Sequence, residues 1–236
     1  MVLTSLFDGR LEPLTYSIGF LSAPPERVAR AARWLYFRWP DAWRRVAVLD
    51  CGLEEALLQL QPLEGFLHPR VLVASTALNG WSAVFNGSIH GLGGRGLSVR
   101  LSRALRVPGY FVAAAPPASD PEHFPGFRQF YVLGPQTGRD HVRAVWVSEE
   151  EDVGRWHFGT DGEVQPYEDV EAYRRRRHTD RLTERMLVDY AAAVGLRPWE
   201  DSFYRPPFHL ITSLRLGRDR FQRTLAQART EMKLDE

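Results

Sequence analysis

The amino-acid sequence predicts an α+β protein, folded as a single domain over residues 1–236 around a mixed sheet. The N-terminal half alternates short apolar runs with amphipathic helical patterns, in two βαβ-like units. Residues 127–167 change to short, aromatic-rich runs typical of an antiparallel meander, and residues 168–196 follow as a helical segment. With 236 residues, 44% of them hydrophobic, the chain is long enough to bury one substantial core.

The first unit consists of a strand at 15–21, a helix at 24–38 and a strand at 46–49. The helix is indicated by proline and an acid in its first turn, Pro25 and Glu26, and by apolar residues at helical spacing behind them. A short helix at 53–60 follows and is ended by Pro62, because proline lacks the backbone donor that a helix needs. Residues 70–76 then read as another strand.

The second unit consists of a strand at 81–85, a glycine-rich loop at 91–96, a helix at 97–107 and a strand at 110–115. Leu97, Leu101 and Leu105 fall on one face of that helix. Because both units share the order strand, turn, arginine-edged helix, strand, residues 14–77 and 78–117 form a possible pseudo-repeat. The likeness is one of pattern and not of residue identity, so coincidence is the alternative.

The C-terminal half is predicted to hold strands at 127–133, 141–147, 155–158 and 163–167, followed by helices at 168–178 and 183–194. Thr160-Asp161-Gly162 suits a hairpin turn between the last two strands, since Asp-Gly readily takes positive φ. Thr183 is the expected N-cap of the second helix, and Gly195 is placed where a helix ends. A strand at 209–214 and a helix at 221–232 complete the chain.

The expected core combines aromatic and aliphatic side chains from both halves. Its members are Trp81, Phe85, Leu101, Leu105, Val112, Phe130, Val132, Val145, Trp156, Phe158, Leu187 and Tyr190.

Charge and composition exclude several classes of protein. A formal net charge of +1 gives no global field to gather nucleic acid or an anionic membrane. No apolar run approaches the roughly 20 residues that span a bilayer, and the N-terminus lacks the pattern of a secretory signal. The one cysteine, Cys51, has no partner for an internal disulfide, which agrees with a reducing compartment. We therefore expect a cytoplasmic protein.

The glycine loop formally matches the G-x-G-x-x-G fingerprint of dinucleotide-binding proteins, with Gly91, Gly93 and Gly96 at the three positions. The context differs, because the glycines do not directly follow a strand and no acidic residue ends the next one. We expect an ordinary turn without a cofactor, and keep cofactor binding at Gly91, Gly93 and Gly96 as the alternative.

No other pattern carries a defined chemistry. The histidines are scattered without the spacing of metal ligands, so no metal site is expected. Cys51 follows an apolar strand. A cysteine in that position is more often a small buried side chain than a nucleophile. The run Arg174–Arg177 is placed on the predicted helix 168–178 among acids, which favours a salt-bridged helix surface over a nucleic-acid site.

The acidic run Glu149, Glu150, Glu151 and Asp152 follows an aromatic-rich strand. Such a run is usually a solvated connection between strands. It is also what a protein that neutralises a basic partner would display, because complementary charge steers association. The run is therefore the candidate partner-binding surface.

A resemblance supports that second interpretation. Residues Gly80-Trp81, Arg128-Gln129-Phe130-Tyr131, Arg155-Trp156-His157-Phe158, Gln165-Pro166-Tyr167-Glu168 and Asp180-Arg181-Leu182-Thr183 give this chain a pattern that resembles a group of uncharacterised bacterial proteins associated with toxin–immunity loci. The resemblance covers about residues 78–205 and excludes residues 1–77. It implies a protein-binding role and carries over no catalytic residue.

Two functions are therefore expected from the sequence. The first is a non-enzymatic cytoplasmic binding protein, an immunity protein that neutralises a bacterial toxin by stoichiometric occlusion. The alternative is a small-molecule or nucleotide-using enzyme with a site near Gly91–Gly96, where His68, His90 and Asp50 stand at ends of predicted strands. A neighbouring toxin-like reading frame would favour the first, and a metabolic operon the second.

Overall fold

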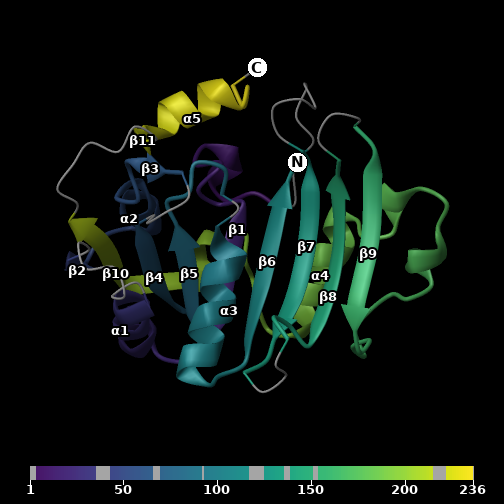
Figure 1. The fold of residues 1–236 in the computed structure, drawn as a ribbon, viewed down its shortest axis with the longest axis horizontal. Coiled ribbons are helices and arrows are strands. Elements are labelled where there is room, and N and C mark those ends of the chain that lie inside the picture. Colours follow the sequence, from purple (N-terminus) through teal and green to yellow (C-terminus); the bar gives the residue numbers. More distant parts are fainter. Residues whose placement is uncertain are drawn as a thin grey trace.

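Nine strands form one continuous sheet in the computed structural model, which describes residues 4–35, 43–65, 70–91, 93–116, 125–135, 139–150, 154–214 and 222–235. Their order is β2-β10-β4-β5-β1-β6-β7-β8-β9, and each neighbouring pair is antiparallel (Figure 1). The strands of this sheet are β1 Ser17–Leu21, β2 Trp43–Leu49, β4 Val71–Thr76, β5 Ser82–Asn86, β6 Gly109–Ala115, β7 Phe127–Leu133, β8 Arg143–Glu149, β9 Trp156–Gly162 and β10 Tyr204–Leu214. Two short strands, β3 Leu63–Glu64 and β11 Gln222–Arg223, pair separately.

The helices lie outside the sheet and connect its strands. The α-helices are α1 Pro25–Leu35, α2 Leu53–Leu58, α3 Gly94–Leu105, α4 Glu184–Ala193 and α5 Leu225–Glu231. Four short 3₁₀ turns are η1 Phe7–Gly9, η2 Ala172–Arg174, η3 His178–Asp180 and η4 Asp201–Phe203. The predicted α+β class is confirmed, and every strand and helix predicted between residues 15 and 147 is present.

The expectation of a mixed sheet is wrong for the described strands, because their neighbours in the large sheet are all antiparallel. The helix α3 does connect two strands that run in the same direction, β5 and β6. However, β1 pairs antiparallel with both of them and separates them. In the same way β10 lies between β2 and β4. The βαβ-like patterns were real, but strands from distant parts of the chain occupy the places between their strands.

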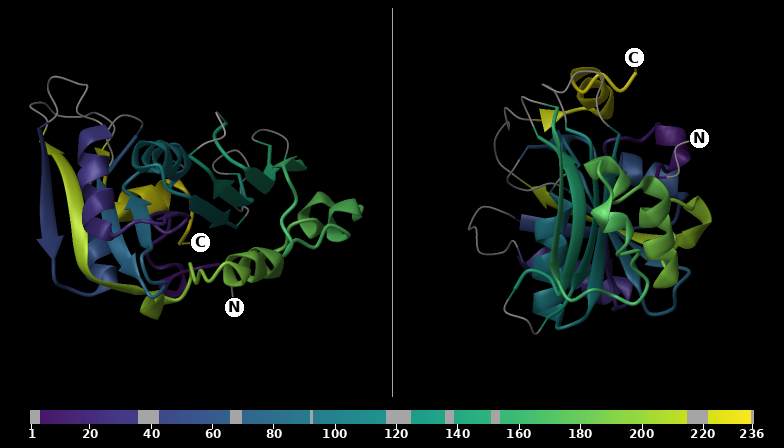
Figure 2. Two further views of the ribbon diagram at one scale, coloured as in Figure 1. Left: turned by 90° about the horizontal axis from the view of Figure 1, so that it is seen from below. Right: turned by 90° about the vertical axis from the view of Figure 1, so that its right-hand side faces the viewer.

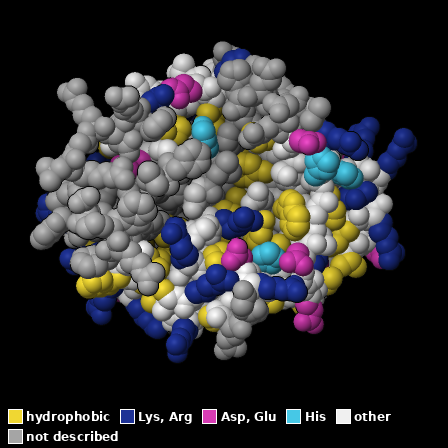
Figure 3. All heavy atoms as spheres, viewed as in Figure 1, with side chains coloured by type: hydrophobic (Ala, Val, Ile, Leu, Met, Phe, Trp, Pro, Cys, Tyr) yellow, Lys and Arg dark blue, Asp and Glu magenta, His cyan; other side chains and the backbone are white. Residues whose placement is uncertain are grey.

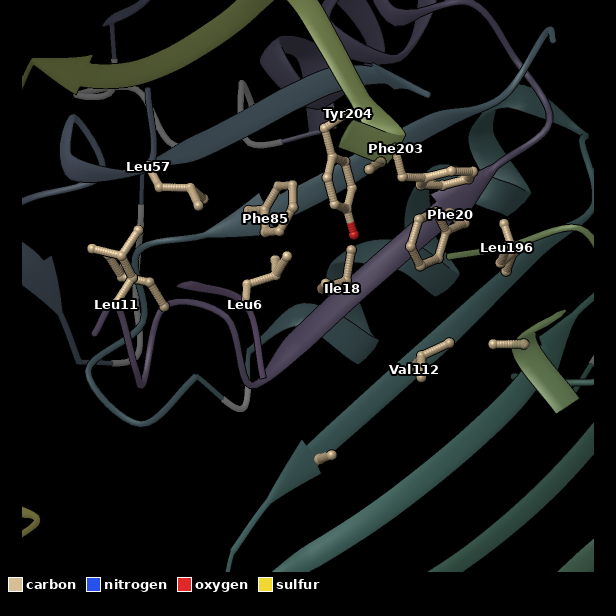
Figure 4. Close-up of a cluster of buried hydrophobic side chains, with 14 of the residues drawn as sticks. Leu6, Leu11, Ile18, Phe20, Leu57, Phe85, Val112, Leu196, Phe203 and Tyr204 are labelled. Carbon is tan, nitrogen blue, oxygen red and sulfur yellow. The ribbon is translucent and has the colours of Figure 1, made fainter. Parts of the chain in front are cut away.

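Helices cover both faces of the sheet (Figure 2). On the first face, α1 and α3 bury Val28, Ala32, Leu97 and Leu101 in one apolar cluster with strand residues such as Val84. The opposite face carries the N-terminal segment, α2 and α4. Its cluster includes the buried side chains of Ile18, Phe20, Phe85, Phe203 and Tyr204, which lie close together (Figure 4).

The predicted N-cap of α4 is confirmed, whereas the last helix begins later than predicted, because α5 starts at Leu225 and residues 222–223 form β11 instead. The Thr183 hydroxyl accepts a hydrogen bond from the backbone N–H of Met186 at 3.2 Å. Thr224 and Gln227 form a reciprocal capping box at the start of α5. Helix α5 contributes Leu225 and Ala228 to the core of one face, while Met232 just beyond it joins an apolar cluster on the other.

Two predicted elements around residue 160 are wrong. The hairpin of strands 155–158 and 163–167 does not form, because β9 runs unbroken from Trp156 to Gly162. The helix 168–178 does not form either, since η2 and η3 are single turns and the backbone at Arg175 and Arg177 between them is extended. Local sequence favoured both elements, and a long-range ion pair overrides that preference.

That ion pair joins Arg143 on β8 to Glu168. The Arg143 guanidinium donates two hydrogen bonds to the Glu168 carboxylate, at 2.9 and 2.6 Å, and the two side chains are only 3% and 1% exposed. A third bond runs from Arg143 to the Gly162 carbonyl at 2.8 Å, and the Tyr173 hydroxyl donates to Glu168 at 2.7 Å. Burial lowers the pKa of Arg143, but the bonds and charge of Glu168 outweigh it and leave that pKa raised.

Most of the predicted core is buried. Trp81, Val132, Trp156 and Phe158 are the exceptions, being only partly buried. Trp156 and Phe158 lie on β9, an outermost strand of the sheet with one strand neighbour instead of two. Membership of the core therefore follows position in the sheet as well as side-chain type.

Breaking the buried ion pair should destabilise the protein strongly. We expect Arg143→Met to lower the free energy of unfolding by about 3–5 kcal/mol, because it leaves the Glu168 carboxylate buried without a countercharge. The control is Arg185→Met, which breaks the exposed helical pair of Arg185 and Asp189 and should cost no more than about 0.5 kcal/mol. Urea denaturation of both variants measures the difference, and equal losses would contradict the structural role assigned to Arg143.

Candidate functional site

The glycine loop is explained by backbone geometry. Gly91 has φ +65°, and a Cβ there would lie 2.5 Å from the Pro13 carbonyl oxygen and 3.0 Å from the Cβ of Tyr16. Gly93 has an ordinary φ of −66° and is the N-cap of α3, while a Cβ at Gly96 would meet nothing within 4 Å. Of the three motif positions, only Gly91 therefore requires glycine for packing, and that requirement comes from contact with the N-terminal segment.

The acidic run begins at the end of β8. The Glu149 carboxylate accepts a hydrogen bond from the backbone N–H of Gly126 at 3.1 Å, which gives it a structural role. Glu150 is exposed and contacts the His157 ring nitrogen Nε2 at 2.9 Å. Glu151 and Asp152 lie outside the described residues. Of the two described acids in this partner-binding prediction, Glu150 is the one available at the surface.

The other sequence candidates do not gather into a site. No group of three histidine, cysteine or acidic side chains that could hold a metal ion occurs in the part of the chain that the structure describes. His68 lies outside that part, and His90 and Asp50 are exposed. Cys51 is partly buried, and desolvation followed by the charges of Glu55 and Asp50 raises the pKa of its thiol. A raised pKa disfavours the thiolate that a nucleophile requires.

The run Arg174–Arg177 has a different environment from the predicted helix surface. Arg174 pairs with Glu171 at 3.0 Å, and Arg175 pairs with Asp169 at 3.8 Å. Arg176 and Arg177 instead line an open cleft of about 330 Å³. The other residues of this arginine cleft are Arg155, Trp156, His178 and Thr179.

The first face of the sheet is open over β8 and β9, where none of the described helices lies in front of the strands (Figure 1). Trp146 of β8 is partly buried there and lies across Gly159 of β9, since any Cβ on Gly159 would collide with the indole ring. Tyr131 of β7 is held beside it on the same face by Arg95 of α3, whose guanidinium donates to the tyrosine hydroxyl at 3.0 Å. These residues form what we name the aromatic face: Tyr131, Trp146 and Gly159.

Charged groups border the aromatic face at both ends. At one end, Asp161 contacts His141 at 3.0 Å and Arg139 at 3.9 Å. The His141 hydrogen bond, assisted by the charges of His141 and Arg139, lowers the pKa of the Asp161 carboxyl. At the other end lies the pair of Glu150 and His157. Figure 3 shows hydrophobic side chains in the middle of this view with charged and histidine side chains around them.

Neither the aromatic face nor the arginine cleft was predicted. The uninterrupted apolar run Ala144-Val145-Trp146-Val147 was a usable signal for the first, because a strand apolar on both sides presents an apolar surface to each face of its sheet. The arginine cleft left no such signal, since it depends on how residues 168–180 fold.

This chain matches no protein-family model, no curated protein and no solved structure. None of the described helices combines the length and the apolar character needed to cross a bilayer. The aromatic face and the arginine cleft are therefore the features of the described surface that bear on function.

The glycine loop yields a test of its own. Gly91→Ala should lower the free energy of unfolding by about 2 kcal/mol or more, because it combines a left-handed backbone with a clash against Pro13. Gly93→Ala should change it by less than about 1 kcal/mol in either direction, because its backbone already suits alanine. Chemical denaturation of both variants compares them. Equal effects, or saturable stabilisation by NAD or ATP that Gly93→Ala abolishes, would contradict a purely structural loop.

Proposed function

We propose that this protein is a binding protein that holds a second protein on its aromatic face. The observation that carries the proposal is Trp146, a large aromatic side chain fixed flat across Gly159 on a part of the sheet that no described helix covers. Tryptophan, tyrosine and arginine are the residues that dominate binding energy at the centres of protein interfaces. Trp146 and Arg95 supply two of these types, and Tyr131, which is only 5% exposed, supports Arg95 from the buried side.

The surroundings of Trp146 have the anatomy of an interface centre. Tyr131 is fixed twice by Arg95, through the hydrogen bond at 3.0 Å and through a guanidinium stacked 5.2 Å from its ring centroid. Its ring also meets the edge of His141 at 5.4 Å. Such restraint lowers the conformational entropy that binding would otherwise cost. An apolar centre with charged groups at its border matches the usual division of interfaces into core and rim.

The partner we propose is a protein with a basic patch next to an apolar centre. Glu150 stands at the end of the face where the acidic run lies, and its carboxylate is 52% exposed. Charge there would attract a basic surface from a distance and increase the association rate more than the affinity. Acidic groups of the partner would meet Arg95 and Arg139 at the opposite end.

In its specific form, the proposal is that the protein is a cytoplasmic immunity protein that occludes a toxin. The resemblance over residues 78–205 supports this form, since β7, β8 and β9 all fall within it. Stoichiometric occlusion needs a surface and no catalytic group, which fits an aromatic face without an assembled acid and base. The alternative of an enzyme near Gly91–Gly96 gains no observation in its favour.

The first test removes the proposed anchor. A partner captured from the native host should bind Trp146→Ala at least about 30-fold more weakly than the unchanged protein, the effect of losing an interface hot spot. The control is Trp34→Ala on α1, a tryptophan that is 58% exposed and distant in the fold, and it should leave affinity within about twofold. Surface plasmon resonance with purified partner gives both values. Equal affinity of the two variants would refute the assigned face, and turnover of a metabolite without any captured protein would favour an enzyme.

A second test concerns the acidic run. Glu150→Lys combined with Glu151→Lys should slow association with a basic partner by about tenfold at low salt and weaken its salt dependence, while dissociation changes little. Glu54→Lys combined with Glu55→Lys on α2 makes the same charge change on the opposite face and should slow association far less at the same low salt. Stopped-flow measurements at several salt concentrations separate the two. Equal slowing by both pairs would show that net charge, and not the acidic run, steers the partner.

A further inference from the structure

The arginine cleft is a second surface feature, adjoining the Glu150 and His157 end of the aromatic face, since the His157 and His178 ring centroids lie 6.2 Å apart. Its arginines come from two places: Arg155 immediately precedes β9, and Arg176 and Arg177 belong to the segment between η2 and η3. The backbone at Arg177 is extended, with φ −82° and ψ 130°. Although successive side chains of an extended segment point to opposite sides, Arg176 and Arg177 both line this cleft.

Among the residues that the structure describes, the exposed side chains of Arg155, Arg176 and Arg177 have no ion pair or hydrogen bond. Two acids of the same segment are already paired: Glu171 forms an ion pair with Arg174, and Asp169 forms one with Arg175. Asp180 and Glu184 act instead on Arg128. Burial lowers the pKa of Arg128, and the charges of Glu184 and Asp180 offset only part of that decrease. Within the part of the chain that the structure describes, the positive charge of the cleft is therefore unpaired, in a protein of net charge +1.

The remaining residues of the cleft add fixed polar and aromatic groups. His178 donates from Nδ1 to the Trp156 carbonyl at 2.5 Å, which leaves Nε2 as the ring nitrogen available to a ligand. The Arg128 guanidinium lies 5.4 Å from the Trp156 ring centroid. Arg128 is itself anchored by bonds to the carbonyls of Leu182 and Thr179, at 2.7 and 3.2 Å. Two of the groups that line the cleft are thus held in place by contacts of their own.

We propose that the arginine cleft binds the phosphate group of a small phosphorylated molecule. One carboxylate satisfies one guanidinium in a two-bond pair, whereas three guanidinium groups and an imidazole match a group with more charge and more acceptor oxygens. Phosphate provides both. The cleft is open, with a volume of about 330 Å³, so it leaves one side of a small phosphorylated ligand in contact with solvent.

The surroundings favour a small ligand over a nucleic-acid chain. The segment that supplies Arg176 and Arg177 also carries the acids Asp169, Glu171 and Asp180. A long phosphate backbone that followed this segment would meet these carboxylates, and like charges repel. A ligand with a single phosphate group avoids them.

Isothermal titration calorimetry at low ionic strength tests the proposal with four probes: inorganic phosphate, ribose 5-phosphate, adenosine 5′-monophosphate and adenosine. The three phosphate-bearing probes should bind saturably with one site per chain, and adenosine should not bind. Comparison of the three distinguishes free phosphate from a sugar phosphate or a nucleotide as the preferred source. Arg176→Gln and Arg177→Gln should each weaken binding about tenfold or more, the usual effect of losing a charge-assisted hydrogen bond.

Arg174→Gln is the matched control, because it makes the same change two residues away on a side chain that is 80% exposed and paired with Glu171. It should leave affinity within about twofold, and thermal melting of all variants checks that they fold. The proposal is overturned if no phosphate-bearing probe binds, if adenosine binds as well as its monophosphate, or if Arg174→Gln weakens binding as much as Arg176→Gln. Tighter binding of a single-stranded oligonucleotide than of every small probe would also overturn it. Partner binding on the aromatic face does not enter this test.

Discussion

The buried ion pair between Arg143 and Glu168 determines the arrangement of the C-terminal half. Two charges removed from water are tolerated only with well-placed bonds, and here Gly162, Gln165 and Tyr173 complete the bonding. Because Glu168 must reach Arg143 from behind the sheet, the chain leaves β9 at Gly162 and crosses to that face. Residues 163–203 then cover one face only, and the opposite side of β8 and β9 is left with Trp146.

Elements with a local cause could be predicted from the sequence. Thr183 and Gly195 delimit α4 through contacts within a few residues, and Leu97, Leu101 and Leu105 define the buried side of α3 through spacing alone. The order of strands had no local cause. Nothing near Ser17–Leu21 indicates that this strand separates β5 from β6, more than 60 residues later in the chain.

The candidate sites likewise combine features visible in the local sequence with features that depend on long-range pairing. The charges of Arg174–Arg177 were evident, but their environment depended on whether residues 168–178 formed a helix, and a partner 25 residues away in the sequence decided that. Trp146 was expected only as part of an aromatic-rich strand. Its exposure depends on Gly159, whose missing side chain makes room for the indole, and this match between neighbouring strands requires their register. Arg176, Arg177 and Trp146 thus became candidates only when long-range pairing was known.

The position of β10 has a consequence for how the chain folds. In the described sheet β2 pairs only with β10, and β10 also completes the pairing of β4. During synthesis, β2 and β4 therefore emerge long before the strand that joins them, about 155 and 130 residues later along the chain. Contacts of such long range fold slowly, and an unpaired strand edge is prone to associate with other chains in the interval. A nascent chain interrupted before residue 204 should therefore depend on chaperones to stay monomeric.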